Sequence, residues 1–324
     1  MAETAPALVL CVPSKGRLQE NAHAFFARAG LDVVRARGAR DYRGRLAQVP
    51  GVEIAFLSAS EIVAQLAAGT AHLGVTGEDL VRESVPDADT RLALLTPLGF
   101  GHANVVVAVP QAWIDVATMA DLEDVAGAFH ARRGERMRVA TKYVNLTRRF
   151  FAEAGVCDYR IVESLGATEG APAAGQAELI VDITTTGATL QANALKILDD
   201  GVMLHSQANL VAALRANWSP QAREAARIIL SRIAAEELAR TTRELEATGL
   251  TQASKVAADA SANFNASSLV HSATEITFSV PSGKATALAD WLVGQGAARV
   301  TIRAHQAVFS ADNPLAEALF RHLA

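Results

Sequence analysis

Short runs of β-branched and apolar residues alternate with helix-forming stretches up to about Leu214. The first pair is a strand at Leu8–Val12 followed by a helix at Lys15–Ala29, and Val52–Leu57 and Leu73–Val75 are further buried strands. Such alternation is typical of an α/β domain with mostly parallel strands. Open α/β sheets bind ligands beyond the carboxyl ends of their strands, so residues that follow strands are the first candidates for function.

The same alternation then starts again with different contents, which predicts a second α/β lobe. Its expected elements are strands at Asn104–Val109, Arg138–Thr141, Tyr159–Glu163 and Glu178–Ile183 and helices at Asn145–Ala154 and up to Asn193–Leu198. A long strand at Met203–Ala212 can return to the first lobe. We therefore expect two lobes with a central cleft, as in periplasmic binding proteins: residues 1–103 with about 192–217, and residues 104–191.

The chain changes character after Trp218, which predicts a third unit over residues 218–324. Ser219 and Pro220 are a typical helix cap and first-turn pair, and the helical pattern extends to about Glu246. Residues 248–272 are rich in Ala, Ser and Asn and are expected to be a linker or a loose helical segment. The rest predicts a small α/β domain of the ferredoxin or ACT type, with elements at Glu275–Val280, Gly283–Leu292, Arg299–Ala304 and from Asn313.

Composition excludes several classes of protein. The net charge is −4 and the pI about 6.1, without a basic stretch that would bind nucleic acid. We find no apolar run of 18 residues and no basic leader before an apolar stretch, so we expect a cytoplasmic protein and no membrane contact. Cys11 and Cys157 both stand among apolar residues and are expected to be buried thiols in a reducing compartment.

The most informative segment is ELIVDITTTGATLQAN, residues 178–193. An apolar strand that contains Asp182 runs into a hydroxyl-rich turn and then a helix; the turn consists of Thr184, Thr185, Thr186, Gly187, Ala188, Thr189 and Leu190. Successive backbone N–H groups in such a turn suit a terminal phosphate, and an acid at the strand end suits ribose hydroxyls or hydrated Mg²⁺. The alternative is structural, because threonine hydroxyls also cap helices.

Several strings together resemble one family. They are VPSKGRL from Val12, AHLGVTGEDLVRE from Ala71, LGFGHAN from Leu98, RVATKYVNLTRRFF from Arg138 and the turn after Asp182. In this order they are similar to ATP phosphoribosyltransferases, and the resemblance covers most of the chain up to about Leu214. Glu275–Phe309 also resembles part of the regulatory domain of the family's long form.

The resemblance implies an enzyme that condenses ATP with phosphoribosyl pyrophosphate in the presence of Mg²⁺, the first step of L-histidine biosynthesis. It implies that Asp182 and Thr184–Leu190 bind the ribose 5-phosphate and that Glu169 lies near the ribose or the metal. Lys15, Gly16 and Arg17 are expected near the nucleotide or pyrophosphate, and so are Thr141, Lys142 and Tyr143. The implied catalytic residues are Asp182, Glu169, Lys15 and Arg17, with Asp182 and Glu169 also meeting Mg²⁺, directly or indirectly.

Structural interpretations stand beside these roles. Lys15 and Arg17 can be solvated residues of a first helical turn, although cations there oppose the helix dipole. By spacing alone Lys142 and Arg148 indicate a solvated face, and Glu78 and Asp79 can be helix-start carboxylates. His102 and His205 are isolated, so we assign neither a metal and expect no obligate catalytic histidine.

Two departures from the family pattern matter. Ser58 stands where the family commonly has an arginine, and a nearby arginine could replace it; the candidates are Arg35, Arg37, Arg40, Arg43 and Arg45. The segment before Glu275 does not match the regulatory domain. We therefore expect feedback inhibition by L-histidine, and assembly into a homo-oligomer (a dimer or a hexamer), from the family alone. The alternatives are a phosphoribosyltransferase for a free base, and a catalytically weak regulatory or small-molecule-binding protein of the same two-lobed fold.

Overall fold

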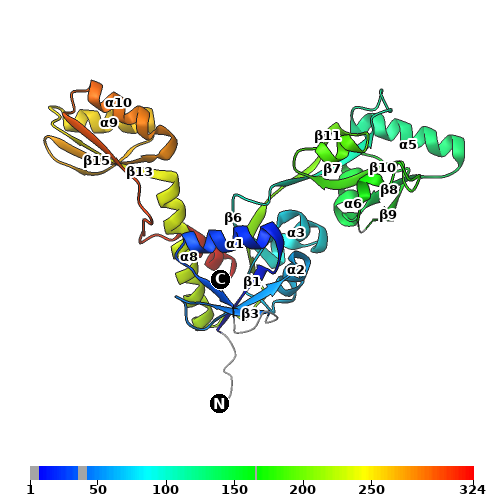
Figure 1. Cartoon of the computed structure of the whole chain (residues 1–324), viewed down its shortest axis with the longest axis horizontal. Coiled ribbons are helices and arrows are strands. Elements are labelled where there is room, and N and C mark those ends of the chain that lie inside the picture. Colours follow the sequence, from blue (N-terminus) through cyan, green and yellow to red (C-terminus); the bar gives the residue numbers. More distant parts are fainter. Residues whose placement is uncertain (1–6, 36–41, 165) are drawn as a thin grey trace, which may run out of the picture.

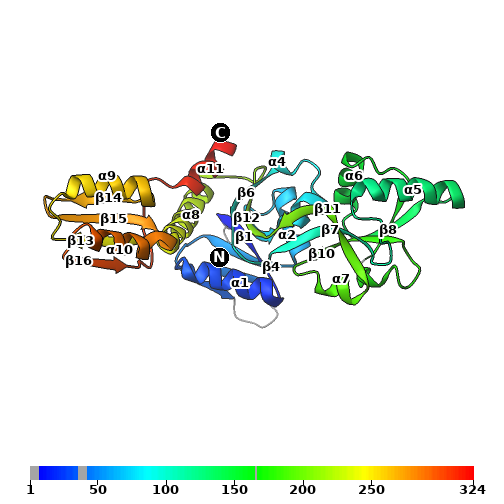
Figure 2. The same cartoon turned by 90° about the horizontal axis from the view of Figure 1, so that it is seen from above.

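The computed structural model describes residues 7–35, 42–164 and 166–324, which form three sheets in three separate bodies. The first lobe lies in the middle, the second lobe on one side and a small C-terminal domain on the other (Figures 1 and 2). Among these residues no helix is long and apolar enough to cross a membrane. The expected two-lobed α/β core with a small third domain is confirmed.

The first lobe is built on a seven-stranded sheet of order β2-β3-β4-β1-β5-β12-β6. Its strands are β1 (Leu8–Pro13), β2 (Val33–Arg35), β3 (Arg43–Leu46), β4 (Val52–Leu57), β5 (Leu73–Gly77), β6 (Leu92–Pro97) and β12 (Ala208–Ala213). Its helices are α1 (Gly16–Arg28), α2 (Ala59–Ala68), α3 (Glu78–Ser84) and α4 (Ala88–Arg91). Side chains of β1 alternate between two cores, one on each face of the sheet, which explains why this strand is apolar throughout.

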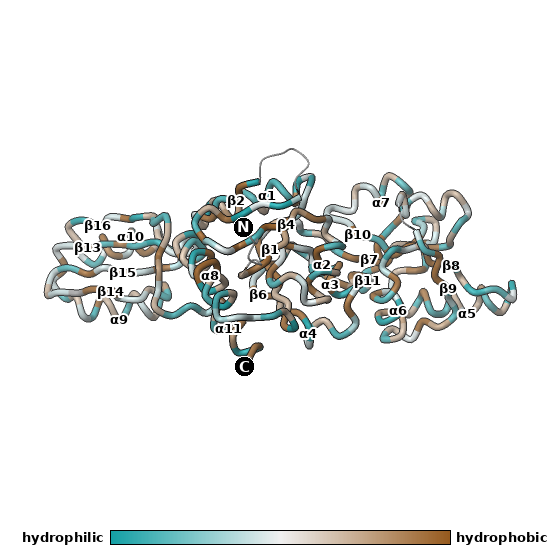
Figure 3. The backbone as a smooth tube through the Cα atoms, turned by 90° about the horizontal axis from the view of Figure 1, so that it is seen from below, coloured by the Kyte–Doolittle hydropathy of each residue, from teal (hydrophilic) through white to brown (hydrophobic). Residues whose placement is uncertain are grey.

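The second lobe has a five-stranded sheet of order β11-β7-β10-β8-β9. Its elements are β7 (Ala103–Pro110), α5 (Met119–Arg133), β8 (Met137–Thr141), α6 (Val144–Glu153), β9 (Tyr159–Glu163), a 3₁₀ turn (Thr168–Gly170), β10 (Leu179–Thr184), α7 (Ala188–Ala192) and β11 (Leu195–Ser206). Strands β8, β9 and β10 are parallel, and β7 runs antiparallel between β10 and β11. In Figure 3 the hydrophobic segments gather inside both lobes.

The expected helix end at Asn193–Leu198 is wrong, because Leu195 begins strand β11, which pairs with β7. A short apolar run is compatible with a helix or a strand, and here pairing with a distant strand decides. The chain therefore returns to the first sheet at Gln207 rather than at about residue 192. It crosses between the lobes twice, through residues 98–102 and at Gln207.

Helix α8 (Pro220–Thr241) ends at Thr241, not at Glu246 as expected, because the next residues form strand β13. For residues 248–272 the linker alternative is wrong and the helical one holds only for part of the range, because they hold the end of one strand, a helix at Ala253–Phe264 and a strand at Ser267–His271. The C-terminal domain consists of β13 (Thr242–Thr248), α9 (Ala253–Phe264), β14 (Ser267–His271), β15 (Glu275–Pro281), a 3₁₀ turn (Ser282–Lys284), α10 (Ala285–Gly294) and β16 (Arg299–Arg303). Its order β14-β15-β13-β16 and its βαββαβ succession are those of a ferredoxin-like domain.

The segment after β16 returns to the first lobe. Its helix α11 (Pro314–His322) lies beside α8, and Ala316 and Leu319 are buried in the first-lobe core. The guanidinium groups of Arg223 and Arg227 on α8 lie 5.8 and 5.0 Å from the Phe320 ring. Both ends of the C-terminal domain are thus anchored on the first lobe, through α8 and through α11.

The two cysteines differ in exposure. Cys11 is buried, and burial raises the pKa of its thiol to about 12. Cys157 is exposed, so the expectation of two buried thiols is wrong for it. Its apolar sequence neighbours Val156 and Tyr159 pack into the second-lobe core, but the turn between them faces the solvent.

Replacing Leu319 tests whether α11 is part of the first-lobe core. Leu319 is fully buried, so Leu319→Ala should lower the free energy of unfolding by about 2–5 kcal/mol, through lost burial and the cavity left behind. Phe309 lies in the same returning segment but is 65% exposed, and Phe309→Ala should change stability by less than about 0.5 kcal/mol. Urea unfolding of both variants measures this, and equal losses would contradict the packing.

Candidate functional site

The threonine-rich turn follows β10 directly and begins α7 at Gly187. Gly187 has φ 77°, a left-handed conformation that a residue with a side chain adopts only with strain. Its N–H donates to the Thr184 hydroxyl at 2.9 Å, and the Ala188 N–H to the Thr186 hydroxyl at 3.4 Å. These hydroxyls therefore fulfil the structural role that the sequence left open, because they hold the turn closed.

The turn also lines a cavity of about 250 Å³ beside the first chain crossing. The cavity is bounded by Ala103, Ile183, Thr184, Thr185, Thr186 and Thr189. The Thr185 hydroxyl donates to the carbonyl of His102, which fixes the turn to the crossing segment. Hydroxyl groups and the start of α7 thus surround a space at the junction of the lobes, a chemistry that suits an anion.

Asp182 lies two residues before the turn, in β10 between β7 and β8. Its Oδ1 accepts a hydrogen bond of 2.8 Å from the Ile183 N–H. Burial raises the pKa of Asp182, and the charge of Glu169 acts in the same direction, whereas the Ile183 N–H and Lys142 lower it. The fold therefore holds a carboxylate where its charge costs free energy, which is typical of functional acids.

Glu169 and Lys142 complete the group around Asp182. Glu169 is half-buried in the 3₁₀ turn that follows Ala167, a residue with φ 49°. Lys142 is exposed after β8, and its Nζ lies 5.0 Å from the centroid of the Tyr143 ring. Two carboxylates and one ammonium group from three segments of the second lobe thus lie within electrostatic reach of one another.

Thr141 and Tyr143 on either side of Lys142 point inward. Thr141 is fully buried, and its hydroxyl accepts the N–H of Tyr143 at 2.8 Å. Tyr143 is 1% exposed and donates its hydroxyl to Asp79 of the first lobe. Of the three predicted residues, Lys142 alone has its side chain at the surface, and the hydrogen bond between the other two closes a turn over it.

Lys15, Gly16 and Arg17 are exposed at the start of α1. Gly16 has φ 70°, and Lys15 is the residue that precedes the helix. The next residue, Leu18, is so close to the crossing segment that a Cβ on Gly101 would lie 3.3 Å from its side chain. The structure thus brings this cationic segment of the first lobe to the same crossing on which the threonine turn is fixed.

Ser58 has a structural role of its own. It caps α2 in a reciprocal pair with Glu61: the Glu61 N–H donates to the Ser58 hydroxyl, and the Ser58 N–H to the Glu61 carboxylate. Among the arginines that could compensate, Arg35 lies over the Phe56 ring and Arg43 pairs with Glu53. Arg45 is exposed, whereas Arg37 and Arg40 lie outside the described residues.

The isolated histidines lie near the crossings. His205 is hydrogen-bonded to Asn104 at 3.0 Å, and His102 is exposed. No group of three or more His, Cys, Asp or Glu side chains that could hold a metal ion by themselves occurs within the described ranges. Glu78 and Asp79 lie in the first turn of α3, where their charges complement the helix dipole as expected.

Sequence reasoning missed the partners of Asp79. The Ser206 hydroxyl donates to its Oδ1 at 2.8 Å and the Tyr143 hydroxyl to its Oδ2 at 2.9 Å. The three residues are up to 127 positions apart. No local pattern could indicate these partners.

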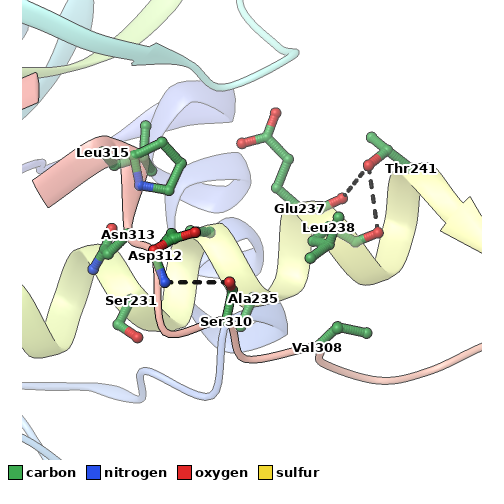
Figure 4. Close-up of a pocket in the computed structure, with 12 residues that line it drawn as sticks. Ser231, Ala235, Glu237, Leu238, Thr241, Val308, Ser310, Asp312, Asn313 and Leu315 are labelled. Atoms are coloured by element: carbon green, nitrogen blue, oxygen red, sulfur yellow. Dashed lines mark hydrogen bonds between the residues drawn. The ribbon is translucent and has the colours of Figure 1, made fainter. Parts of the chain in front are cut away.

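A larger cavity, of about 430 Å³, lies away from these residues, between α8 and the returning C-terminal segment (Figure 4). Its polar lining includes Ser231, Glu237, Thr241, Ser310 and Asp312. Because this lining carries two carboxylates and no Lys or Arg, it disfavours a phosphate, and we place the candidate active site at the crossings and not here.

Replacing Asp182 tests what its half-buried charge costs in stability. Its folded-state pKa is raised, so ionisation is less favourable in the folded than in the unfolded chain, and stability falls as pH rises through that pKa. Asp182→Asn should therefore be more stable than the parent at pH 8, with a difference that shrinks toward pH 4. Urea midpoints at both pH values measure this, with the exposed Asp115→Asn as the control. A parent that is equally stable at pH 8 would contradict the burial cost.

Comparisons with known proteins show which family this chain resembles. Residues 58–235, more than half of the chain, match the family model HisG, ATP phosphoribosyltransferase. An ATP phosphoribosyltransferase of Nitrobacter winogradskyi is 61% identical over 96% of this chain and 97% of its own length. That of Afipia carboxidovorans is 69% identical over 73% of both chains.

Among solved structures, a chain of the ATP phosphoribosyl transferase (HisG:HisZ) complex from Thermotoga maritima superposes with a TM-score of 0.53 at 26% identity. The alignment covers 70% of this chain and 95% of that chain. The family match, the identity over nearly the full length and the shared fold lead to one conclusion. This chain belongs to the ATP phosphoribosyltransferase family.

Proposed function

We propose that this chain transfers the phosphoribosyl group of phosphoribosyl pyrophosphate to ATP, giving N-phosphoribosyl-ATP and pyrophosphate, the first step of L-histidine biosynthesis. The observation that supports it most directly is the identity of 57–69% to ATP phosphoribosyltransferases over most of the chain. The threonine turn beside Asp182 provides a place for the sugar phosphate. Membership of the family favours ATP over a free base as the acceptor. It also favours an active enzyme over a purely regulatory protein.

The turn from Thr184 to Leu190 is the proposed site of the ribose 5-phosphate. Its cavity is lined by threonine hydroxyls and lies at the start of α7, where the N–H groups of a first helical turn have no partner within the helix. Gly187 gives the turn its left-handed corner, and the Thr184 hydroxyl holds that corner. Asp182, two residues earlier, is then in place to meet the ribose hydroxyls.

Asp182 and Glu169 fit a Mg²⁺ that also binds substrate phosphates. Magnesium in nucleotide enzymes is commonly held by one or two carboxylates together with phosphate oxygens and water, so a set of three protein acids is not required. The raised pKa of Asp182 reflects a half-buried carboxylate that a cation would stabilise. When bound, Mg²⁺ would neutralise charge that grows on the leaving pyrophosphate.

The proposed mechanism depends on electrostatics rather than on a strong base. The attacking ring nitrogen of adenine has a free lone pair; its bond to the anomeric carbon forms as the bond from that carbon to the pyrophosphate oxygen breaks. Asp182 and Glu169 favour the positive charge that develops on the ribose. Lys15, Arg17 and Lys142 are the proposed cations for the pyrophosphate and the nucleotide, with Gly16 leaving the backbone open. Thr141 and Tyr143 contribute through the hydrogen bond that closes the turn over Lys142.

Regulation and assembly are proposed from the C-terminal domain. A ferredoxin-like domain that is joined to the core by α8 suits a regulatory role, and we propose L-histidine as its effector. We also propose a homo-oligomer, a dimer or a hexamer, in the cytoplasm. Light scattering with and without L-histidine measures the mass, and loss of turnover on adding L-histidine measures the inhibition.

Pyrophosphate release from phosphoribosyl pyrophosphate, ATP and Mg²⁺ tests the activity. Asp182→Asn should lower kcat by about 10²-fold, the usual effect of removing one group that stabilises charge in the transition state. The exposed Asp115→Asn, in the same lobe, should leave kcat unchanged. Adenine, guanine and uracil serve as rival acceptors. Faster release with any of them than with ATP would refute the assignment.

A further inference from the structure

The cavity of about 430 Å³ between α8 and the segment that returns to the first lobe has walls that the chain itself holds in place (Figure 4). The returning segment is hydrogen-bonded to α8 at two points. The Val308 N–H donates to the Ala235 carbonyl at 3.0 Å, and the Asn313 side chain donates to the Arg227 carbonyl at 3.4 Å. Residues 309–312 join these two points beside the cavity. Small-molecule sites are commonly pre-formed in this way and of this size.

Apolar side chains line both walls of the cavity. Ala234 and Leu238 come from α8, and Val308 and Leu315 come from the returning segment. Leu238 is 37% exposed and is not among the residues of the first-lobe core. An apolar group that enters between these side chains leaves water on both sides, which is favourable. The cavity therefore suits a ligand with an apolar body.

The charge of the cavity is negative on both walls. Glu237 of α8 and Asp312 of the returning segment belong to its lining, which holds no lysine or arginine. Neither carboxylate forms an ion pair with another of the described residues, whereas the other two acids of α8, Glu224 and Glu236, are paired with arginines. Carboxylates beside an apolar surface that excludes water attract a cation more strongly than they do in bulk solvent.

The same charges disfavour a ligand that carries an anionic group. The hydroxyl of Thr241 already donates to the Glu237 carbonyl at 2.7 Å, and that of Ser310 accepts the Asp312 N–H at 3.3 Å. The carboxylate of an amino acid would thus meet two like charges without a cation in the lining to offset them. The cavity is accordingly not a site that suits L-histidine.

We propose that this cavity is a binding site for a small organic cation, an amine with an apolar body and no anionic group. The body lies between Leu238 and Leu315, and the ammonium group is held at the carboxylates of Glu237 and Asp312. The site shares no residue with the cavity at the threonine turn, so the inference does not depend on the proposed transferase activity.

Three indole compounds test the ligand class on the full-length protein. Tryptamine carries an ammonium group, tryptophol a neutral hydroxyl in its place, and L-tryptophan an additional carboxylate. Tryptamine should bind saturably with a Kd below about 1 mM in calorimetry or saturation-transfer NMR, which is ordinary for a ligand of its size. Tryptophol and L-tryptophan should bind at least about fivefold more weakly, because charge is the only feature that separates them from tryptamine. Equal affinity for all three would overturn the proposal.

Replacing the carboxylates tests where the cation binds. Glu237→Gln and Asp312→Asn should each weaken tryptamine binding about two- to fivefold, the usual range for a partly exposed ion pair, and the double variant should weaken it further. Glu224→Gln is the matched control, because Glu224 lies on the same helix but does not line the cavity. An unchanged Kd in the double variant would overturn the proposal. An equal loss in Glu224→Gln would also do so, because it would indicate attraction to the negative net charge of the chain.

Filling the cavity tests the apolar body independently of charge. Ala234→Phe places a ring between the two walls and should abolish tryptamine binding while leaving the melting temperature near that of the parent. Should this variant unfold, the carboxylate variants still decide, because both replaced side chains reach the solvent. Absence of saturable tryptamine binding to the parent would overturn the proposal, and it is the result expected if a second copy of the chain covered this groove. Pyrophosphate release is not a readout here, so a failure of the proposed function would leave these results unaffected.

Discussion

The two crossings of the chain between the lobes constrain the catalytic core more than any other feature. The second lobe is inserted between β6 and β12, and β12 returns to pair antiparallel with both β5 and β6. All six residues of β12 are buried. Because β12 follows the whole second lobe in the sequence, the core of the first lobe includes residues from both sides of that insertion. The candidate site lies beside the first of these crossings, where the Thr185 hydroxyl donates to the carbonyl of His102.

The site combines rigid backbone with an unfavourable charge. Thr184 and Thr186 use their hydroxyls to hold the turn, and the Thr185 hydroxyl fixes it to the crossing segment. Asp182 stands beside this turn in an environment that disfavours its ionised form. The ionised Asp182 carboxylate thus lowers the stability of the fold compared with an apolar side chain at this position. Such a cost is common for groups that interact with a charged substrate.

The C-terminal domain has a hydrophobic core of its own, yet the chain beyond it also packs on the first lobe. Its hydrophobic cluster, which includes Leu245, Phe278 and Leu288, is separate from the cores of the two lobes. The chain nevertheless continues past β16 and buries α11 against α8. Both ends of the domain are thus anchored on the first lobe, and α8 packs into the same core as Leu8, Leu10 and Val12 of β1.

The sequence by itself determined the features that depend on neighbouring residues. Local backbone and charge preferences account for the β-branched strands and for the helix start at Ser219 and Pro220. They also account for Gly187 in the turn and for Glu78 and Asp79 in a first helical turn. Tertiary structure decided the features that depend on distant partners. Leu195–Ser206 became a strand through pairing with β7, and residues 248–272 became α9 and β14 because the strands around them completed a sheet. Asp79 met Tyr143 and Ser206 only when the two lobes came together, because a hydrogen bond between residues 64 or 127 positions apart leaves no signal in either local sequence.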